Sequence, residues 1–306
     1  MSSIAADSPG HSTASAHPFV PLRREDVRLL TGRGLFTADV RPEGAAHVAF
    51  VRSMHANGRL VSVDASAALA MPGVIAVLTA RELGAHRIPS INPLLPVARA
   101  CSFDLLADQR VSWSGQAVAL VVASTRDVAR AAADQVLVEV DAEPAVTDRM
   151  EDGEPMVRVS HRFPDPSQPA TPSAEATGGD GARIAASVAV SIDSPRLVAM
   201  ALEPRAVTVQ VLDRDRGLIV WLASQSPARA RDDIARVLGL DAARVRVITP
   251  DVGGAFGARA SVVPEDLLVP WAAWRLGRSL RWVATRGEEF TAGMHGRGSR
   301  MSARLE

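Results

Sequence analysis

The sequence predicts a mixed α/β (α+β) fold, built from two ordered regions that a polar segment separates. In residues 21 to 148, apolar strand signals alternate with helix signals, as they do in α/β and α+β domains. Residues 149 to 183 are rich in Pro, Ser, Thr and Gly and have little apolar surface to bury, so we expect a linker there. Strand and helix signals return in residues 184 to 306.

The first region contains four predicted strands and two predicted helices. Short apolar runs mark the strands: "AHVAFVRS", "VIAVLTA", "AVALVVA" and "VLVEVDAEP". One helix is expected in "DASAALAMPG", where Asp64 is the expected N-cap and Pro72 with Gly73 ends the helix. The other is expected in "TRDVARAAADQ", with Thr125 as its cap.

The second region begins with strand patterns and continues with two helices. The predicted strands are "RIAASVAVSI", "AVTVQVL", "GLIVWLAS" and "ARVRVITP". The helix signal in "SPARARDDIARVLGLD" is well marked, because Ser226 suits the cap, Pro227 the first turn and Gly239 the end. Pro270 lies inside the next expected helix, "EDLLVPWAAWRLG", and should kink or delay it.

The composition excludes several classes of function. The chain has 34 basic and 34 acidic side chains among 306 residues, so no net charge attracts it to nucleic acid or anionic lipid. One cysteine, Cys101, excludes a disulfide framework, a cysteine zinc site and an iron–sulfur cluster within this chain. No apolar run is long enough for a membrane span. Residues 1 to 20 lack the features of a secretory signal, so we expect a disordered tail and a cytoplasmic protein.

A glycine loop, "ITPDVGGAFGARA", follows the last predicted strand of the second region. It does not match the dinucleotide pattern G-x-G-x-x-G, because the required positions hold Ala255 and Ala258. It also lacks the Gly-Lys-Ser/Thr of a phosphate loop. Two interpretations remain from the residues alone: a tight strand-to-helix turn, or a loop whose backbone N–H groups approach a ligand.

An ordered set of motifs surrounds this loop. "DVGGAFGAR" resembles the "DVGGGFGGK" loop of the molybdenum hydroxylases, the family of xanthine dehydrogenase, aldehyde oxidase and aerobic carbon monoxide dehydrogenase. In the family's order, "LRREDVRLLTGRGLFTADV", "FVRSMHANGRLVSVDASAALAMPGVIAVLTA", "GQAVALVVASTRDVARAAADQ", "ALEPRAV", "WLASQSPARARDDIARVLGL" and "LGRSLRWVATRGEEFTAGMHGRG" also resemble family segments. The resemblance covers residues 21 to 148 and 200 to 300.

The resemblance implies a fold and a cofactor. Residues 21 to 148 would form an α/β hammerhead domain, and residues 184 to 306 the N-terminal part of a molybdopterin-binding domain. The implied cofactor is molybdenum-molybdopterin, either simple or in its cytosine dinucleotide form. The residues implied near it are Gln225, Gly253, Gly254, Ala255, Phe256, Gly257 and Arg259, with no direct metal ligand.

By the resemblance, Gln225 directs its amide to an oxygen ligand of molybdenum, and the loop N–H groups face the same acceptor. Phe256 would form an apolar wall of the substrate pocket.

The chain departs from the family pattern at several positions. Ala255 and Ala258 replace glycines and Arg259 replaces lysine. If position 255 needs a positive φ, alanine costs about 1 kcal/mol there.

The implied activity is oxidative hydroxylation of an N-heterocycle or aldehyde-like substrate, with water as the oxygen source. The family's general-base glutamate and most pterin-anchoring segments fall outside the matched part, so no catalytic residue is assigned in this chain. Our hypothesis is half of a split catalytic subunit, inactive alone. Its partners would be a C-terminal-half chain, an iron–sulfur subunit and, as a further candidate, an FAD subunit. The alternatives are a non-catalytic or truncated relative that acts as a binding or assembly module, and an unrelated α/β protein.

Several polar residues also have structural interpretations. Glu203 is either a carboxylate facing the cofactor or, as we favour, part of a corner in which it pairs with a nearby arginine such as Arg205. Without the resemblance, Gln225 would be a polar group flanking a helix. His55 and His295 have no second histidine at ligand spacing and are expected to be structural.

Overall fold

The computed structural model describes residues 23–84, 86–89, 102–145, 187–213 and 215–305. The predicted tail, the predicted linker and Cys101 lie outside these ranges. The chain divides into two compact units, residues 1–34 and residues 35–306. In the first unit the structure describes one short helix, α1 (Asp26–Leu30). Everything below concerns the second unit.

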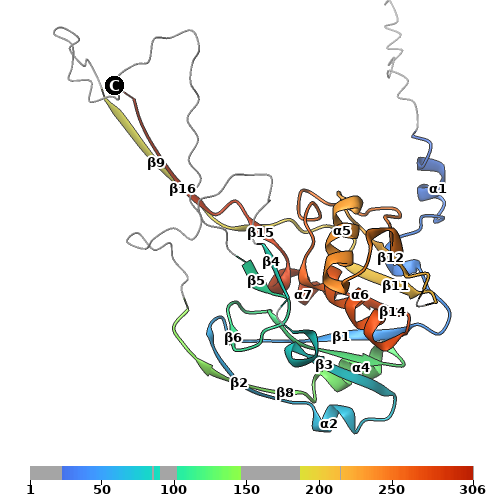
Figure 1. Ribbon diagram of the computed structural model, residues 1–306. Helices are drawn as coiled ribbons and strands as arrows, with labels where there is room; N and C mark the ends of the chain where they lie inside the picture. The colour runs from blue at the N-terminus through green and yellow to red at the C-terminus, as the bar shows by residue number, and fades with distance from the viewer. Residues whose placement is uncertain (1–22, 85, 90–101, 146–186, 214, 306) are drawn as a thin grey trace, which may run out of the picture. The chain divides into compact units, whose positions relative to one another are not determined.

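A seven-stranded mixed sheet forms the centre of the second unit (Figure 1). In spatial order its strands are β13 (Val245–Ile248), β12 (Leu218–Leu222), β11 (Ala206–Val211), β14 (Leu280–Val283), β1 (Ala46–Arg52), β7 (Ala117–Ala123) and β3 (Val74–Thr79). The pairs β1/β14 and β12/β13 are parallel, and the other neighbours are antiparallel. The predicted mixed α/β class is confirmed, and strands from both ordered regions share this one sheet.

Smaller sheets account for the other strands. A three-stranded sheet contains β6 (Arg110–Val111), β2 (Gly58–Asp64) and β8 (Leu137–Ala142). Three two-stranded pairs are β4 (Arg87–Pro89) with β5 (Ser102–Asp104), β10 (Leu197–Val198) with β15 (His295–Gly296), and β9 (Val188–Ser194) with β16 (Ser299–Leu305). In the β9/β16 ribbon, Val188, Val190 and Ile192 alternate along β9 and are each about half exposed. This ribbon therefore presents an apolar face that no other described element covers.

The helices pack on the sheet or close its loops. They are α2 (Ser66–Leu69), α3 (Ala80–Leu83), α4 (Arg126–Ala133), α5 (Pro227–Leu238), α6 (Pro264–Leu276) and α7 (Arg286–Ala292), with 3₁₀ turns η1 (Thr37–Asp39) and η2 (Ala242–Arg244). None of the helices in the described ranges is long and apolar enough to cross a bilayer. Thr125 caps α4 by accepting a hydrogen bond from the Val128 N–H, and Gly239 ends α5 in the left-handed conformation, as predicted.

Three local predictions need correction. Asp64 is not the N-cap of α2: it is the last residue of β2, and its carboxylate accepts from the Ser66 N–H. Ser226 makes no side-chain cap bond to α5, and its own N–H donates to the Ser224 hydroxyl. Pro270 does not delay α6, which begins at Pro264 and continues through Pro270. Buried side chains on both sides of Pro270 hold the helix against the sheet and offset the lost backbone bond.

The hydrophobic core joins the two ordered regions. Buried residues of β1 and β7 lie in one cluster with those of β11, β12, β14, α5 and α6. At its centre, Phe50 of β1 meets Trp282 of β14 edge to face, with ring centroids 5.3 Å apart. The opposite face of β1 and β7 packs on α2 and α4 through alanine and valine side chains. Helices thus cover both faces of the sheet, which fixes the loops at the strand ends.

Candidate functional site

The glycine loop connects β13 to α6, as the sequence predicts. Its backbone adopts positive φ at Gly254 (113°), Phe256 (51°) and Gly257 (86°). Position 255 is not among the positive-φ positions, so Ala255 carries none of the strain that was considered for it. The strained residue is instead Phe256, whose side chain is 76% exposed.

Glu203 and Arg259 form a buried clamp beneath this loop. One Arg259 terminal nitrogen donates to the Glu203 Oε2 over 2.6 Å, and the other donates to the Glu203 main-chain carbonyl over 2.6 Å. The same carboxylate oxygen accepts from the Gly253 N–H at 2.9 Å. Both side chains are buried. Glu203 therefore pairs with an arginine, as expected, but the partner is Arg259 and not Arg205.

The glycines allow a close approach that larger residues would block. A Cβ at Gly253 would lie 2.5 Å from the Glu203 Cβ. A Cβ at Gly254 would lie 2.9 Å from the Phe256 ring and 3.1 Å from the Ala201 Cβ. The loop is thus held against the segment around Glu203 at a distance that requires glycine at both positions.

A second set of buried charges lies next to the clamp. Arg205 donates to Glu265 over 2.9 Å and to Glu289 over 3.2 Å. Arg52 donates to the other oxygen of Glu265 over 2.8 Å and to Glu288 over 2.9 Å. This charge network ties β1, α6, α7 and the start of β11 together. Sequence reasoning missed it, because bonded partners in it are up to 236 positions apart along the chain.

Within this network, the protonation of Glu265 is set by two opposing effects. Its side chain is almost completely buried, which by itself raises the pKa of a carboxyl group. The guanidinium groups of Arg205 and Arg52 outweigh burial and hold the pKa of Glu265 below its usual value. The pKa of Arg205 is raised, because Glu265 and Glu289 outweigh the desolvation of its guanidinium. Glu265 and Arg205 are therefore both ionised at neutral pH.

Comparison with known proteins identifies both parts of the chain. Residues 31–144 match the aldehyde oxidase and xanthine dehydrogenase a/b hammerhead domain, and residues 168–305 match the molybdopterin cofactor-binding domain. The chain belongs to the molybdenum hydroxylase family. It is 32% identical over 276 residues to the nicotine 6-hydroxylase large subunit of Paenarthrobacter nicotinovorans. The aligned residues cover 89% of this chain and 34% of that protein.

Other relatives give the same result. The chain is 31% identical over 305 residues to the carbon monoxide dehydrogenase large chain of Hydrogenophaga pseudoflava, covering 92% of this chain and 36% of that one. The crystal structure of quinoline 2-oxidoreductase from Pseudomonas putida 86 superposes with a TM-score of 0.79 at 32% identity, covering 93% of this chain and 36% of that one. The chain thus spans about a third of the length of these relatives.

The loop of this molybdenum hydroxylase chain fits an oxygen-rich ligand. Within the described residues, the N–H groups of four successive positions, Gly254, Ala255, Phe256 and Gly257, donate no hydrogen bond. Free N–H donors in a left-handed turn are suited to oxyanion and oxo acceptors. The Gln225 N–H donates to the Arg259 carbonyl at 2.9 Å, which brings Gln225 to the end of the loop with its side chain exposed. The structure therefore gathers the residues implied by the resemblance, with Arg259 beneath the others.

The histidines form no metal centre in the described part of the chain, where no group of three or more His, Cys, Asp or Glu side chains is arranged to hold a metal ion. The Ser53 hydroxyl accepts from the His55 N–H, and the His295 ring lies 3.1 Å from the Phe290 carbonyl oxygen. These contacts are consistent with structural roles for both histidines.

Replacing Ala255 with glycine is expected to lower the stability of the chain slightly, by about 0.5 to 1 kcal/mol, because glycine has more backbone freedom to lose. Phe256→Gly is the matched variant, since Phe256 is the residue with positive φ, and it should lose less stability or gain some. Urea unfolding of both variants measures the difference. Greater stability of Ala255→Gly than of the wild type would contradict this assignment of strain.

Asp266 makes the stability of the folded chain depend on pH. Burial raises the pKa of Asp266 to about 6, against the hydrogen bond from the Val263 N–H and the nearby Arg205. The unfolded value is about 3.9, so between these pH values the folded chain binds more protons than the unfolded chain. The contribution of Asp266 therefore destabilises the fold progressively as the pH rises from about 4 to about 6.

Asp266→Asn should remove this pH dependence, since asparagine keeps an oxygen acceptor for the Val263 N–H. We expect equal stability near pH 4 and a variant that is more stable by about 3 kcal/mol at pH 7. Urea unfolding of both proteins at each pH unit gives the difference, in which the titration of other groups cancels. A difference that does not change with pH would show that Asp266 is not desolvated.

Proposed function

We propose that this chain is the molybdopterin-binding part of a molybdenum hydroxylase-type oxidoreductase and that other polypeptide segments complete its active site. The four free N–H groups of residues 254–257 carry the proposal, because they form a ready-made set of donors for an oxygen-rich ligand in a fold of this family. When bound, a molybdenum-pterin cofactor supplies two-electron oxidation with oxygen derived from water.

The residues of this chain hold and orient the cofactor. The loop N–H groups would donate to its oxygen atoms, and the side-chain amide of Gln225 would be a further donor. The exposed ring of Phe256 walls the substrate side of the pocket. Arg259 has both terminal nitrogens engaged by Glu203, so it acts by positioning the loop and not by contacting the cofactor. The clamp keeps the donors in place before the ligand arrives, which reduces the cost of ordering on binding.

The partners of this chain are part of the proposal. The chain spans about a third of the length of its relatives, and we assign the general base and the remaining cofactor contacts to a C-terminal-half partner. An iron–sulfur subunit would remove the electrons, and an FAD subunit is a further candidate.

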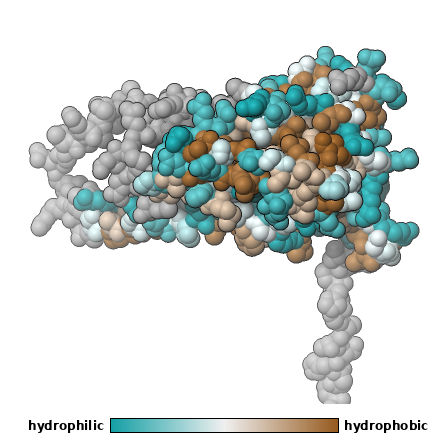
Figure 2. Space-filling view, turned by 90° about the horizontal axis from the view of Figure 1, so that it is seen from below, coloured by the Kyte–Doolittle hydropathy of each residue, from teal (hydrophilic) through white to brown (hydrophobic). Residues whose placement is uncertain are grey.

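Figure 2 shows apolar side chains gathered in patches on one face, with polar side chains between them. Such patches, and the β9/β16 ribbon, suit contact with other chains.

The substrate class is proposed from the relatives. Two of them are named for nicotine and quinoline, which are N-heterocyclic compounds, and another for carbon monoxide. We favour an N-heterocycle or an aldehyde-like compound, because Phe256 offers a flat apolar surface to a flat ring. The pull-down described below, which tests for the partners, also tests whether the cofactor is in its simple form or its cytosine dinucleotide form.

A tagged pull-down from the native host, with molybdenum and nucleotide measured in the eluate, tests the proposal. We expect a C-terminal-half chain, an iron–sulfur chain and nearly stoichiometric molybdenum. Gly254→Val should lose molybdenum without losing the fold, because its side chain would collide with Phe256 and Ala201. Arg231→Gln, on the exposed face of α5, is the matched control and should retain it.

A metal-free chain that copurifies with no family partner would overturn the proposal and favour a non-catalytic binding module. Ala255 gives that alternative no support, since its backbone φ is not positive.

A further inference from the structure

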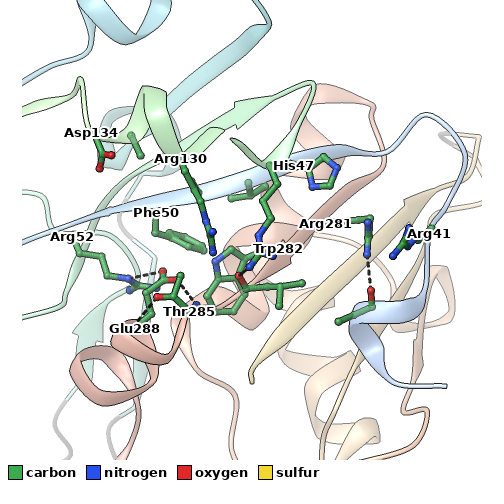
Figure 3. A pocket seen from close by; sticks show the side chains of 16 residues that line it. Arg41, His47, Phe50, Arg52, Arg130, Asp134, Arg281, Trp282, Thr285 and Glu288 are labelled. Carbon is green, nitrogen blue, oxygen red and sulfur yellow. Dashed lines mark hydrogen bonds and ion pairs between the residues drawn. The ribbon is translucent and has the colours of Figure 1, made fainter. Parts of the chain in front are cut away.

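A large pocket opens where β1 and β14 separate. These parallel strands share two register pairs, Ala46 with Leu280 and His47 with Arg281. Beyond them the strands diverge, and a pocket of about 740 Å³ lies between β1, β14, α4 and the segment around Arg41 (Figure 3). The residues of the glycine loop do not line it, so it is separate from the proposed cofactor site.

The pocket is strongly basic. Four arginines line it without an ion pair to any carboxylate in the described part of the chain: Arg41, Arg126, Arg130 and Arg281. A fifth, Arg52, is neutralised by the charge network. The acidic lining residues are Asp134 and Glu288, and Glu288 is already bound to Arg52. Four cationic side chains therefore face one uncommitted carboxylate.

The fold directs these side chains to one space. His47 and Arg281 are register partners on neighbouring strands, so they project from the same face of the sheet. Arg126 and Arg130 are one turn apart on α4, which packs on that part of β1. Figure 3 shows Arg130 reaching from α4 toward Phe50 and Trp282, and Arg41 beside Arg281. Basic groups from three elements thus converge over an aromatic floor.

This arrangement is unfavourable without an anion. Burial lowers the pKa of His47, and the guanidinium groups of Arg281, Arg126 and Arg41 lower it further. Burial and the charges of Arg41 and Arg126 also lower the pKa of Arg281. Asp127 and Asp39 act in the opposite direction and do not cancel the effect. The Arg281 Nε is buried and has no hydrogen-bond acceptor among the described residues. Like charges held close together without a counterion cost stability.

We propose that this pocket is a binding site for a small phosphate-bearing anion, with a pyrophosphate or diphosphate group as the preferred ligand. Guanidinium groups bind phosphate oxygens in pairs, and four of them match a group that carries several oxygens. The pocket volume is that of a small-molecule site, and its concave shape favours a compact anion over an extended acidic peptide. The free anion and the diphosphate of a nucleotide share this chemistry.

Titration of the full chain with inorganic pyrophosphate tests the site, at an ionic strength held constant with sodium chloride. We expect a saturable rise in Tm and a calorimetric binding isotherm, with inorganic phosphate weaker. The double variant Arg126→Gln/Arg130→Gln should bind about tenfold more weakly or worse. Arg229→Gln/Arg231→Gln removes the same charge from α5 and should bind normally. ADP in place of pyrophosphate distinguishes a nucleotide ligand, by tighter binding, from the free anion.

The structure also predicts how the variant behaves without ligand. In the same sodium chloride buffer without phosphate or pyrophosphate, Arg126→Gln/Arg130→Gln should be at least as stable as the wild type, because it relieves repulsion. A folding defect then cannot imitate lost binding. No response to pyrophosphate, or an equal response of the two double variants, overturns the proposal. A hexaglutamate peptide that binds more tightly than pyrophosphate would also overturn it and assign the pocket to an acidic protein segment. None of these measurements requires molybdenum, so their failure is distinct from that of the proposed function.

Discussion

Replacing Glu265 with glutamine is expected to lower the free energy of unfolding by about 4 kcal/mol. Glu265 is almost fully buried between Arg52 and Arg205, and one carboxylate oxygen is bound to each of them. The variant keeps the shape of the side chain but leaves two partly desolvated guanidinium groups without their shared counterion. Breaking a buried ion pair on one side is among the most costly substitutions. Urea unfolding near pH 7 measures the loss.

Asp141→Asn is the control for this prediction. Asp141 also pairs with an arginine, Arg59, but both side chains are more than half exposed, so its loss should have little effect. If the Glu265→Gln variant is no less stable than the Asp141→Asn variant, the charge network contributes little to the stability of the fold. Because the network joins β1 to α6 and α7, we also expect Glu265→Gln to loosen the contact between the two sequence regions, seen as faster hydrogen exchange in β14.

Replacing Arg259 with alanine is expected to lower the free energy of unfolding by about 3 kcal/mol and to release the glycine loop. Arg259 holds both the carboxylate and the main-chain carbonyl of Glu203, and that carboxylate holds the Gly253 N–H. Without the guanidinium, a buried carboxylate is left with one donor. Hydrogen exchange of the loop amides, together with urea unfolding, measures the two effects.

Arg259→Lys separates charge from geometry. A lysine keeps the positive charge, but its single ammonium cannot reproduce the two directed bonds of the guanidinium fork. We therefore expect an intermediate loss of stability and loop exchange closer to that of Arg259→Ala. Full retention of both properties by the lysine variant would show that charge alone holds the loop, and that arginine at this position has no special role.

Every strand of the central sheet except β14, and the long helices, could be predicted from local patterns. "AVALVVA" is fully buried in β7, and such a continuous apolar run is readable without a structure. β2 was not predicted, since polar residues interrupt its sequence and it is mostly exposed. For α5, Ser226 occupies the N-cap position as predicted, but its side chain makes no cap hydrogen bond.

The sequence by itself determined the family, the glycine loop and the set of residues around it, because these depend on residue types at short spacings. Tertiary structure decided which charges meet. Glu203 pairs with Arg259, 56 positions away, and not with Arg205 two residues along, which instead binds Glu265 and Glu289. It also decided that Phe256, and not Ala255, takes the left-handed conformation. Long-range pairing and backbone φ depend on how strands and helices pack, and no local pattern encodes that packing.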